Sequence, residues 1–337
     1  MNGEKEAMMW ESLNGDIRCN LCAHRCTVKK GGYGICRVRK NTDGKLYTLI
    51  YGLATSINVD PIEKKPLYHF YPSTLSYSMG TVGCNFRCAH CQNYTISQAT
   101  IEQAYLRYVS PEVAVSDALS SDCISISWTY NEPTIWFEYT YDSAKLAHKH
   151  GLKTVYVTNG YITEEALREI SPYLDAFRVD IKGGERVYRE LCKAKLEPVL
   201  ESTRIAHELG MHVEVVNLVI PGYNDSEDDI IWLSKWVAEE LSPDIPIHFT
   251  RFYPYYKMQD INPTPISTLE KAYKIAKENS INYPYIGNVM GHLYENTYCP
   301  SCGKLLIERV GYHVNLFIQK PECPECGHPI PIVGLEG

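Results

Sequence analysis

The pattern of apolar and polar positions changes near residue 74, where apolar runs of strand length begin to alternate with stretches of helical periodicity. This alternation predicts parallel strands joined by right-handed helical crossovers. The expected strands are residues 75–82, 123–128, 154–159, 176–182, 212–220 and 246–252. The expected helices are residues 134–150, 164–170, 199–209, 230–240 and 267–278, with a further helical region around residue 188. We therefore predict an α/β fold, built as a full or partial (β/α)6 barrel.

Polar residues recur at the carboxyl ends of the expected strands, where parallel α/β proteins place their active sites. One such asparagine is often only a helix cap or a turn residue, but recurrence at successive strand ends favours a cofactor pocket. The candidate pocket residues are Asn131, Glu132, Thr158, Asn159, Asp180, Lys182, Asn217 and Arg251.

A cysteine-rich loop, GCNFRCAHCQN at residues 83–93, follows the first expected strand. It holds Cys84, Cys88 and Cys91 in the spacing Cys-x3-Cys-x2-Cys, with His90 before the last cysteine. Three thiolates cannot complete a 4Fe-4S cluster, because each iron takes its own terminal ligand. One iron would stay open to a substrate or cofactor, which distinguishes a reactive site from a closed structural one. A partial zinc site or three buried thiols are the alternatives.

Two further cysteine sets lie at the ends of the chain. The C-terminal set lies in two metal-binding knuckles, CPSCG (299–303) and CPECG (323–327), which predict a zinc ribbon. A rubredoxin-type iron site is the minor alternative. Residues 16–39 contain few large apolar residues, so a metal would supply their folding free energy. Spacing leaves zinc and a second iron–sulfur cluster equally open there. The two sets are Cys19, Cys22, Cys26 and Cys36, and Cys299, Cys302, Cys323 and Cys326.

The linear order of these features suggests three domains. Residues 1–70 would hold the first four cysteines and a connector, 71–295 the barrel, and 296–337 the zinc-ribbon module. Within the connector, the proline and lysine content of residues 61–72 predicts a surface linker into the main domain.

Composition narrows the function classes. The 337 residues are 45% hydrophobic and 22% charged, typical of a soluble globular protein. A net charge of −7 gives no bulk signal for nucleic acid or an anionic membrane. No apolar run approaches the ~20 residues of a membrane span, and the N-terminus lacks a signal peptide's apolar core, so we expect a cytoplasmic protein. In that compartment thirteen cysteines favour metal sites over disulfides.

These stretches together resemble the radical S-adenosylmethionine (SAM) protein of the AmmeMemoRadiSam system and, more distantly, the pyruvate formate-lyase activating enzymes. The resemblance covers the chain nearly end to end. It is carried by the N-terminal CxxCxxxC with GxC, NVDPIEKKPLYHF, GCNFRCAHCQN, YNEPT, VTNGY, VDIKG, LEPVLE, IPGYNDSE, GNV and the terminal CPxC pair.

The resemblance implies a role for several residues. Cys84, Cys88 and Cys91 would ligate the 4Fe-4S cluster, whose open iron binds SAM. Glu132 would accept hydrogen bonds from the SAM amino group, and Lys182 of the Asp-x-Lys signature would contact its carboxylate. In the activating enzymes an aspartate before Thr-Asn-Gly helps to hold a monovalent cation. Val157 stands at that place here and cannot bind a cation, so the presence of a cation site in this chain is an open question.

The implied function is reductive cleavage of SAM to a 5′-deoxyadenosyl radical, which takes a hydrogen atom from a substrate that the sequence does not identify, a macromolecule among the candidates. A glycyl-radical-enzyme activase is one alternative, and a metal-binding scaffold without catalysis is another. The expected partners are an electron donor of ferredoxin or flavodoxin type, with Memo-type and AMMECR1-type proteins as candidates. Cys192, near the expected pocket, could donate hydrogen or bind substrate, although a lone cysteine is more often a small core residue.

Overall fold

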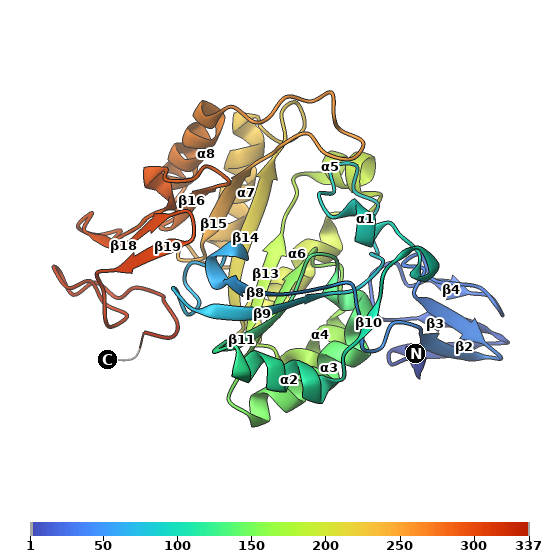
Figure 1. Cartoon of the computed structure of the whole chain (residues 1–337). Coiled ribbons are helices and arrows are strands. Elements are labelled where there is room, and N and C mark those ends of the chain that lie inside the picture. Colours follow the sequence, from blue (N-terminus) through green and yellow to red (C-terminus); the bar gives the residue numbers. More distant parts are fainter. Residues whose placement is uncertain (1–2, 336–337) are drawn as a thin grey trace. The chain divides into compact units, whose positions relative to one another are not determined.

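The computed structural model describes residues 3–335 (Figure 1). These residues form two compact units. The first unit contains the residues up to Asp60, Leu75–Phe177 and Leu191–Met211. The second contains Pro61–Thr74, Arg178–Glu190 and the residues from His212 onward. The domain limits expected from the sequence stay predictions.

The core of the first unit is a sheet whose strands follow the order β12-β11-β9-β8. Strands β9, β11 and β12 are parallel, and Ser125 of β11 pairs with Ser76 on one side and Lys153 on the other. Strand β11 is buried throughout, with the apolar Ile126 and Trp128 on one face and two small serines on the other. The strands are β8 (Ser56–Pro61), β9 (Leu75–Gly80), β11 (Ser125–Trp128) and β12 (Lys153–Thr158).

Capped helices connect these strands. The side chains of Ser110 and Thr163 accept hydrogen bonds from backbone amides in the first turns of α2 and α4, which satisfies donors that the helix itself cannot. The helices of this unit are α1 (Tyr94–Ser97), α2 (Pro111–Ser120), α3 (Phe137–Lys149), α4 (Glu164–Ile170) and α6 (Glu197–Glu208), with 3-10 turns η2 (Ile101–Gln103), η3 (Pro133–Trp136) and η4 (Ser171–Tyr173).

The N-terminal part of the first unit forms small antiparallel sheets, ordered β2-β3-β4 and β1-β6-β5, and a two-stranded pair of β7 and β10. The strands are β1 (Lys5–Glu6), β2 (Trp10–Leu13), β3 (Asp16–Cys19), β4 (Thr27–Val28), β5 (Arg39–Thr42), β6 (Lys45–Thr48), β7 (Leu53–Ala54) and β10 (Arg107–Tyr108).

In the second unit, three parallel strands are ordered β16-β15-β14. They are β14 (His212–Val219), β15 (Ile247–Arg251) and β16 (Pro284–Gly287), with helices α7 (Glu227–Glu240) and α8 (Ile266–Glu278). Strand β13 (Ala176–Asp180) begins in the first unit and ends in the second, and α5 (Glu185–Val187) and a π-helix (Tyr188–Cys192) follow it. Short 3-10 turns are η1 (Ile62–Lys64) and η6 (Leu293–Glu295).

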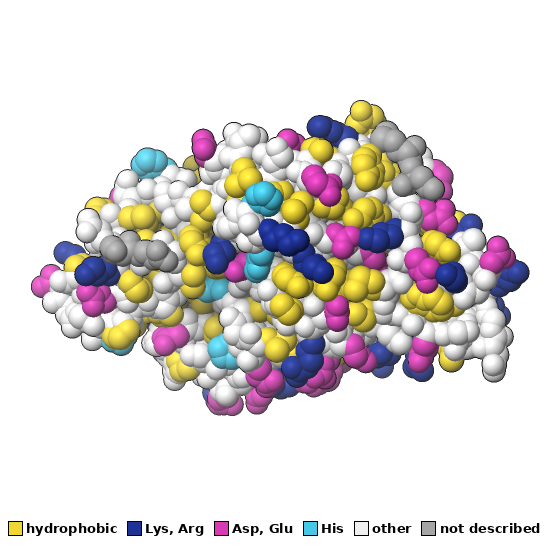
Figure 2. Space-filling model, turned by 90° about the horizontal axis from the view of Figure 1, so that it is seen from below, with side chains coloured by type: hydrophobic (Ala, Val, Ile, Leu, Met, Phe, Trp, Pro, Cys, Tyr) yellow, Lys and Arg dark blue, Asp and Glu magenta, His cyan; other side chains and the backbone are white. Residues whose placement is uncertain are grey.

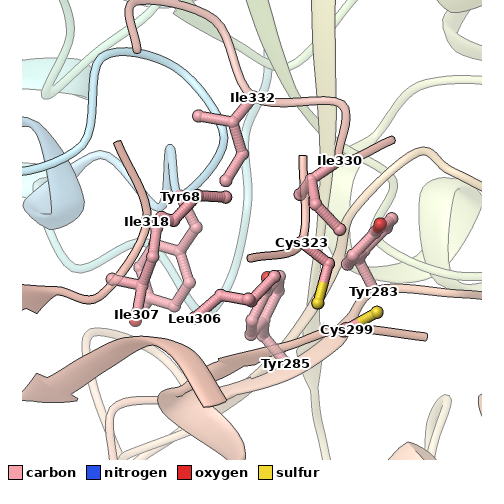
Figure 3. Close-up of a cluster of buried hydrophobic side chains, with 10 residues drawn as sticks. All are labelled: Tyr68, Tyr283, Tyr285, Cys299, Leu306, Ile307, Ile318, Cys323, Ile330 and Ile332. Atoms are coloured by element: carbon pink, nitrogen blue, oxygen red, sulfur yellow. The ribbon is translucent and has the colours of Figure 1, made fainter. Parts of the chain in front are cut away.

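The chain ends in an antiparallel sheet of β17 (Thr297–Tyr298), β18 (Leu305–Val310) and β19 (His313–Leu316). Cys299 and Cys323 belong to the buried cluster drawn in Figure 3, where Tyr68 and Tyr285 also lie. The metal knuckles and the apolar core of this unit are therefore one structure. The α/β fold and the terminal four-cysteine module that the sequence predicts are both present.

Residues 61–72 correct one expectation. They were predicted to form a surface linker, but Ile62, Glu63, Lys65 and His69 are all buried. The backbone amide of His69 donates to Glu214 at 2.8 Å, so a buried carboxylate from a distant strand holds this segment inside the second unit. Strands β8 and β16 are further additions to the predicted set.

None of the helices among the described residues has the length and apolar character needed to cross a membrane. On the face drawn in Figure 2, lysine and arginine side chains alternate with acidic and apolar ones.

Candidate functional site

The cysteine loop leaves β9 at a glycine that the local geometry requires. Gly83 has φ of +91°, a left-handed conformation that side-chain-bearing residues rarely adopt. The turn places Cys84 where its sulfur accepts a hydrogen bond from the Phe86 amide at 3.4 Å. The Cys91 sulfur lies 3.1 Å from the Ser97 hydroxyl. Donors aimed at sulfur stabilise the thiolate form that a metal cluster needs.

The electrostatics of Cys84 connect the three loop cysteines. Burial raises the pKa of its thiol well above the ordinary value, and the negative charges of Glu132, Cys88 and Cys91 raise it further. The three thiols are therefore close enough to act on one another. Binding a cationic cluster would replace that mutual repulsion with attraction and release the thiol protons.

Glu132 lies in the loop after β11, at the N-cap of η3, and is fully buried with three protein donors on its carboxylate. One oxygen accepts from the Thr134 amide at 3.0 Å and the Thr158 hydroxyl at 2.7 Å, and the other from the Asn159 amide at 2.8 Å. Burial raises the pKa of Glu132, and these hydrogen bonds oppose the rise. A carboxylate offers about four acceptor positions, so one is left for an outside donor.

The asparagines predicted for the pocket connect the strand ends to the cysteine loop. Asn131 accepts from the Thr81 amide at 3.1 Å and donates to the Gly83 carbonyl at 2.8 Å. Asn159 donates to the side-chain oxygen of Asn85 at 2.8 Å and lies 3.9 Å from the Cys84 sulfur. The structure thus brings Glu132, Thr158 and both asparagines together around Cys84.

The π-helix brings Cys192 to the same loop. The amide of Arg87 donates to the carbonyl of Cys192 at 3.0 Å, and the amide of Ala89 to that of Leu191 at 2.9 Å. The ligand atoms of Cys88, His90 and Cys192 all lie within 4.8 Å of one another. Cys192 is fully buried, so its thiol faces the loop rather than solvent. π-Helical turns often occur at functional sites.

The other predicted residues belong to the second unit. Asp180 accepts from Arg178 at 2.6 Å and from Lys182 at 3.0 Å. Burial would raise the pKa of Asp180, but the two cations outweigh it and lower the pKa below the ordinary value. Asn217 donates to the Ile181 carbonyl at 2.8 Å. Arg251 donates to the Thr264 carbonyl at 2.8 Å, which fixes its guanidinium beside that loop.

Two polar groups were not singled out from the sequence. Arg178 shares a strand face with Asp180, and the two-residue period of a strand could have revealed this. Asn85 follows Cys84 directly, but its contact with Asn159 depends on the fold. Among the described residues no hydrogen-bond partner reaches the buried Nδ2 of Asn85 in the first unit, or the buried Oδ1 of Asn217 in the second.

The N-terminal cysteines converge around Gly34. A Cβ atom built there would lie 3.6 Å from the Cys36 sulfur and 3.9 Å from the Cys26 sulfur. Burial raises the pKa of the Cys22 thiol, and the thiols of Cys19, Cys36 and Cys26 add to the rise. All four predicted ligands therefore face a common space.

The C-terminal cysteines form a tighter group. Cys299 and Cys326 have sulfurs 3.6 Å apart, as do Cys302 and Cys323. All four sulfurs lie within 4.8 Å of one another, a geometry that can hold one metal ion.

The family and sequence comparisons agree with this arrangement. Residues 79–233 match the family model described as the radical SAM superfamily. Uncharacterized protein MJ0808 of Methanocaldococcus jannaschii is 47% identical over 333 residues, which cover 98% of this chain and 99% of that protein. Uncharacterized protein MJ0674 of the same organism is 23% identical over 279 residues, which cover 79% of this chain and 76% of that protein.

Solved structures with the same fold include a radical SAM methyltransferase from Sphaerobacter thermophilus. It has a TM-score of 0.52 and 14% identity, covering 70% of this chain and 71% of that one. Streptococcus suis SuiB bound to S-adenosylmethionine has a TM-score of 0.51 and 13% identity, covering 67% of this chain and 55% of that one. At such identities the likeness extends to the fold alone.

Proposed function

The chain belongs to the radical SAM superfamily, and on this premise we propose that it reductively cleaves S-adenosylmethionine at a 4Fe-4S cluster held by Cys84, Cys88 and Cys91. When bound, the cluster and SAM supply a 5′-deoxyadenosyl radical that removes a hydrogen atom from a substrate. The observation that carries this proposal is the buried carboxylate of Glu132, held by Thr158 and Asn159 beside the cysteine loop.

In the first unit, the proposed roles are metal ligation, SAM binding and positioning of the cysteine loop. The loop cysteines supply three ligands and leave one iron open. Glu132 offers its remaining acceptor position to the SAM amino group, in a site dry enough to strengthen a charge-assisted bond. Asn131 and Asn159 keep the loop at a fixed distance from that carboxylate, because their amides bond backbone or side chains on both sides.

Three residues of the second unit are proposed as SAM contacts from their positions in the sequence. Lys182 is held by Asp180, and the resemblance of this Asp-x-Lys pair to the activating enzymes supports its proposed contact with the SAM carboxylate. Asn217 has a buried oxygen that suits an amino or hydroxyl donor. Arg251 is proposed to contact the cofactor as well. Val157, at the place where the activating enzymes have a cation-binding aspartate, offers no ligand.

Two finer assignments extend the proposal. Membership of the AmmeMemoRadiSam system, with Memo-type and AMMECR1-type partners and a ferredoxin or flavodoxin electron donor, rests on the sequence motifs. The Asp180–Lys182 pair also suits a glycyl-radical-enzyme activase, whose substrate would be a backbone Cα–H of a partner protein. A catalytically inert scaffold is the alternative that a simple assay separates.

That assay measures 5′-deoxyadenosine formed anaerobically from SAM and a strong reductant by the iron-loaded protein. The native chain should form it, and the Cys88→Ala variant should not. Cys123→Ala is the matched control. Cys123 is also buried, but its thiol donates to the Ser121 carbonyl, outside the cysteine loop. If the native chain, with a full complement of iron, forms no 5′-deoxyadenosine, then the scaffold interpretation is correct.

A further inference from the structure

The two outer cysteine sets differ in how far apart their sulfurs lie. In the C-terminal set all four sulfurs are within 4.8 Å of one another, and two pairs are 3.6 Å apart. Thiolates at about 2.3 Å from one tetrahedral zinc ion stand roughly 3.8 Å from each other. This set therefore has the spacing of a single-ion site.

The N-terminal set is wider. Within the described part of the chain, which includes all four of these residues, no three of their sulfurs lie within 4.8 Å of one another. They still face one space, because Cys26 and Cys36 both border Gly34 and the other three thiols all act on Cys22. A cubane spreads its ligands in this way, since each thiolate binds a different iron.

The central loop provides an internal reference for this spacing. Cys84, Cys88 and Cys91 are the proposed cluster ligands. Their three sulfurs, like the N-terminal ones, do not all lie within 4.8 Å of one another. They are still neighbours, because the charges of Cys88 and Cys91 raise the pKa of Cys84. The N-terminal set thus matches the central loop and differs from the C-terminal set, and all three are compared within one chain.

We propose that Cys19, Cys22, Cys26 and Cys36 hold a second 4Fe-4S cluster, closed by four protein ligands, which passes single electrons to the central cluster. Four ligands leave no iron open, so SAM cannot bind there. The presence of this cluster is independent of the proposed function, whereas its relay role rests on that function.

The surroundings of the four sulfurs suit a cluster. The Ile35 amide donates to the Cys26 sulfur at 3.5 Å, and the Arg39 guanidinium to the Cys19 sulfur at 3.7 Å. Arg39 is 1% exposed and forms an ion pair with Glu138, which is equally buried. Arg39 therefore acts on Cys19 as a hydrogen-bond donor rather than as an isolated cation. Hydrogen bonds to sulfur favour the reduced, more negative state of a cluster.

Three contacts join the two cysteine loops inside the first unit, and each lies within two residues of a ligand in both sets. His24, between Cys22 and Cys26, donates from Nε2 to the Asn85 carbonyl at 2.8 Å. Arg87 donates to the Ile35 carbonyl. A Cβ on Gly83 would lie 3.0 Å from the Cys36 carbonyl oxygen. Neighbouring loops give the short separation that electron tunnelling requires.

The electron balance is simple. A low-potential one-electron donor of ferredoxin or flavodoxin class reduces the N-terminal cluster and is itself oxidised. That cluster returns to its oxidised state when the electron passes to the central cluster. Ligation at both clusters is unchanged, so no bond breaks and no proton moves in the relay.

Metal analysis of a variant without the central ligands tests the site. Cys84→Ala, Cys88→Ala and Cys91→Ala are combined in the full chain, which is reconstituted anaerobically with iron and sulfide. We expect about four iron and four sulfide per chain and a reducible electron paramagnetic resonance signal. Zinc or no metal at this position, in a variant whose C-terminal zinc content shows that it is folded, overturns the proposal.

The reciprocal variant, Cys26→Ala with Cys36→Ala, should halve the iron content of the native chain from about eight to about four. Unchanged iron would also contradict the proposed site. If this variant fails to fold, the first variant still decides the question, because it leaves the N-terminal loop intact. Neither measurement depends on SAM cleavage.

The relay is tested by the fully reduced native chain. Two neighbouring paramagnetic clusters interact, so its resonance spectrum should differ from the sum of the spectra of the two variants. An additive spectrum, with both clusters present, overturns the relay and leaves the cluster assignment standing. Absence of 5′-deoxyadenosine in spite of an interacting pair would instead count against the proposed function.

Discussion

At the scale of one residue, the Glu132 carboxylate has a structural role within the protein and a proposed role in binding SAM. Its carboxylate accepts three protein hydrogen bonds and has capacity for one more. We predict that Glu132→Gln lowers SAM affinity roughly 10- to 100-fold, because a hydrogen bond to a charged group contributes about 1.5–3 kcal/mol. Equilibrium dialysis at matched iron content measures this. Glu165→Gln, at an exposed glutamate of the same unit, is the control, and equal affinities in both variants would refute the role.

The protonation of Glu132 adds a pH dependence to SAM binding. Burial raises the pKa of this carboxyl above its ordinary value, and protonation removes the charge that attracts the SAM amino group. Affinity should therefore fall as the pH is lowered, and the fall should begin above the range near pH 4.3 where exposed glutamates titrate. Dialysis across pH 5–8 should show this slope in the native chain and a flatter profile in Glu132→Gln. Identical profiles would contradict the assignment.

At the scale of elements, Gly83 determines how the cysteine loop meets the N-terminal segment. A Cβ there would lie 2.9 Å from Val38 Cγ1 and 3.0 Å from the Cys36 carbonyl, and φ is +91°. We predict that Gly83→Ala destabilises the chain by about 2–5 kcal/mol, from backbone strain and overpacking together. Gly31→Ala is the matched control, because φ is +75° but nothing lies within 4 Å.

Urea unfolding of both glycine variants, with iron content measured alongside, separates the two causes. Strain alone should cost about 1–2 kcal/mol and should appear in both variants. The excess in Gly83→Ala reports the contact between the two loops, and iron should be lost with it. Equal losses of stability in the two variants would show that the loops are not in close contact.

The same element scale shows what the sequence could and could not predict. Strand β12 was expected at 154–159 and spans Lys153–Thr158, because an apolar run with a polar end is a local pattern. Residues 61–72 were misassigned, because their burial depends on Glu214, which lies about 145 positions away and accepts from the Tyr68 and His69 amides. No local pattern encodes such a partner.

The candidate site divides in the same way. Cys84 and Glu132 could be singled out because their residue types and their places at strand ends are visible in one dimension. Cys192 could also be placed near the expected pocket, because it follows the fourth expected strand. Its packing against Cys88 and the spread of the N-terminal sulfurs could not be predicted, since both depend on how separate loops pack.

At the scale of the whole molecule, His69 links segments from both ends of the second unit. Its Nδ1 donates to the Pro331 carbonyl at 3.1 Å, because a carbonyl can only accept, and Nε2 therefore accepts from the Tyr285 hydroxyl at 2.7 Å. Burial is the main cause that lowers the pKa of His69 to about 3. The folded state thus holds a neutral imidazole that the unfolded chain protonates near pH 6.5.

The sign of the resulting stability change follows from proton uptake. The unfolded chain binds more protons than the folded one between about pH 6.5 and 3, so the free energy of unfolding should decrease as the pH falls through that window. Urea unfolding at pH 7.5 and 5.5 measures the decrease. It should be smaller in His69→Gln, which cannot titrate, and an equally large decrease in that variant would exclude His69 as the cause.

The terminal four-cysteine site provides the last test, because two of its sulfurs are exposed and two are buried. Cys302 and Cys326 are exposed, so replacing both with serine removes ligands without disturbing the packing around Cys299 and Cys323. We predict a loss of about one zinc per chain and a lower unfolding temperature, because the free energy of metal binding contributes to folding. Metal analysis and thermal unfolding measure both, with Cys123→Ala as the control. Unchanged zinc would show that these knuckles hold no ion, and an unchanged unfolding temperature would show that the ion does not stabilise the core.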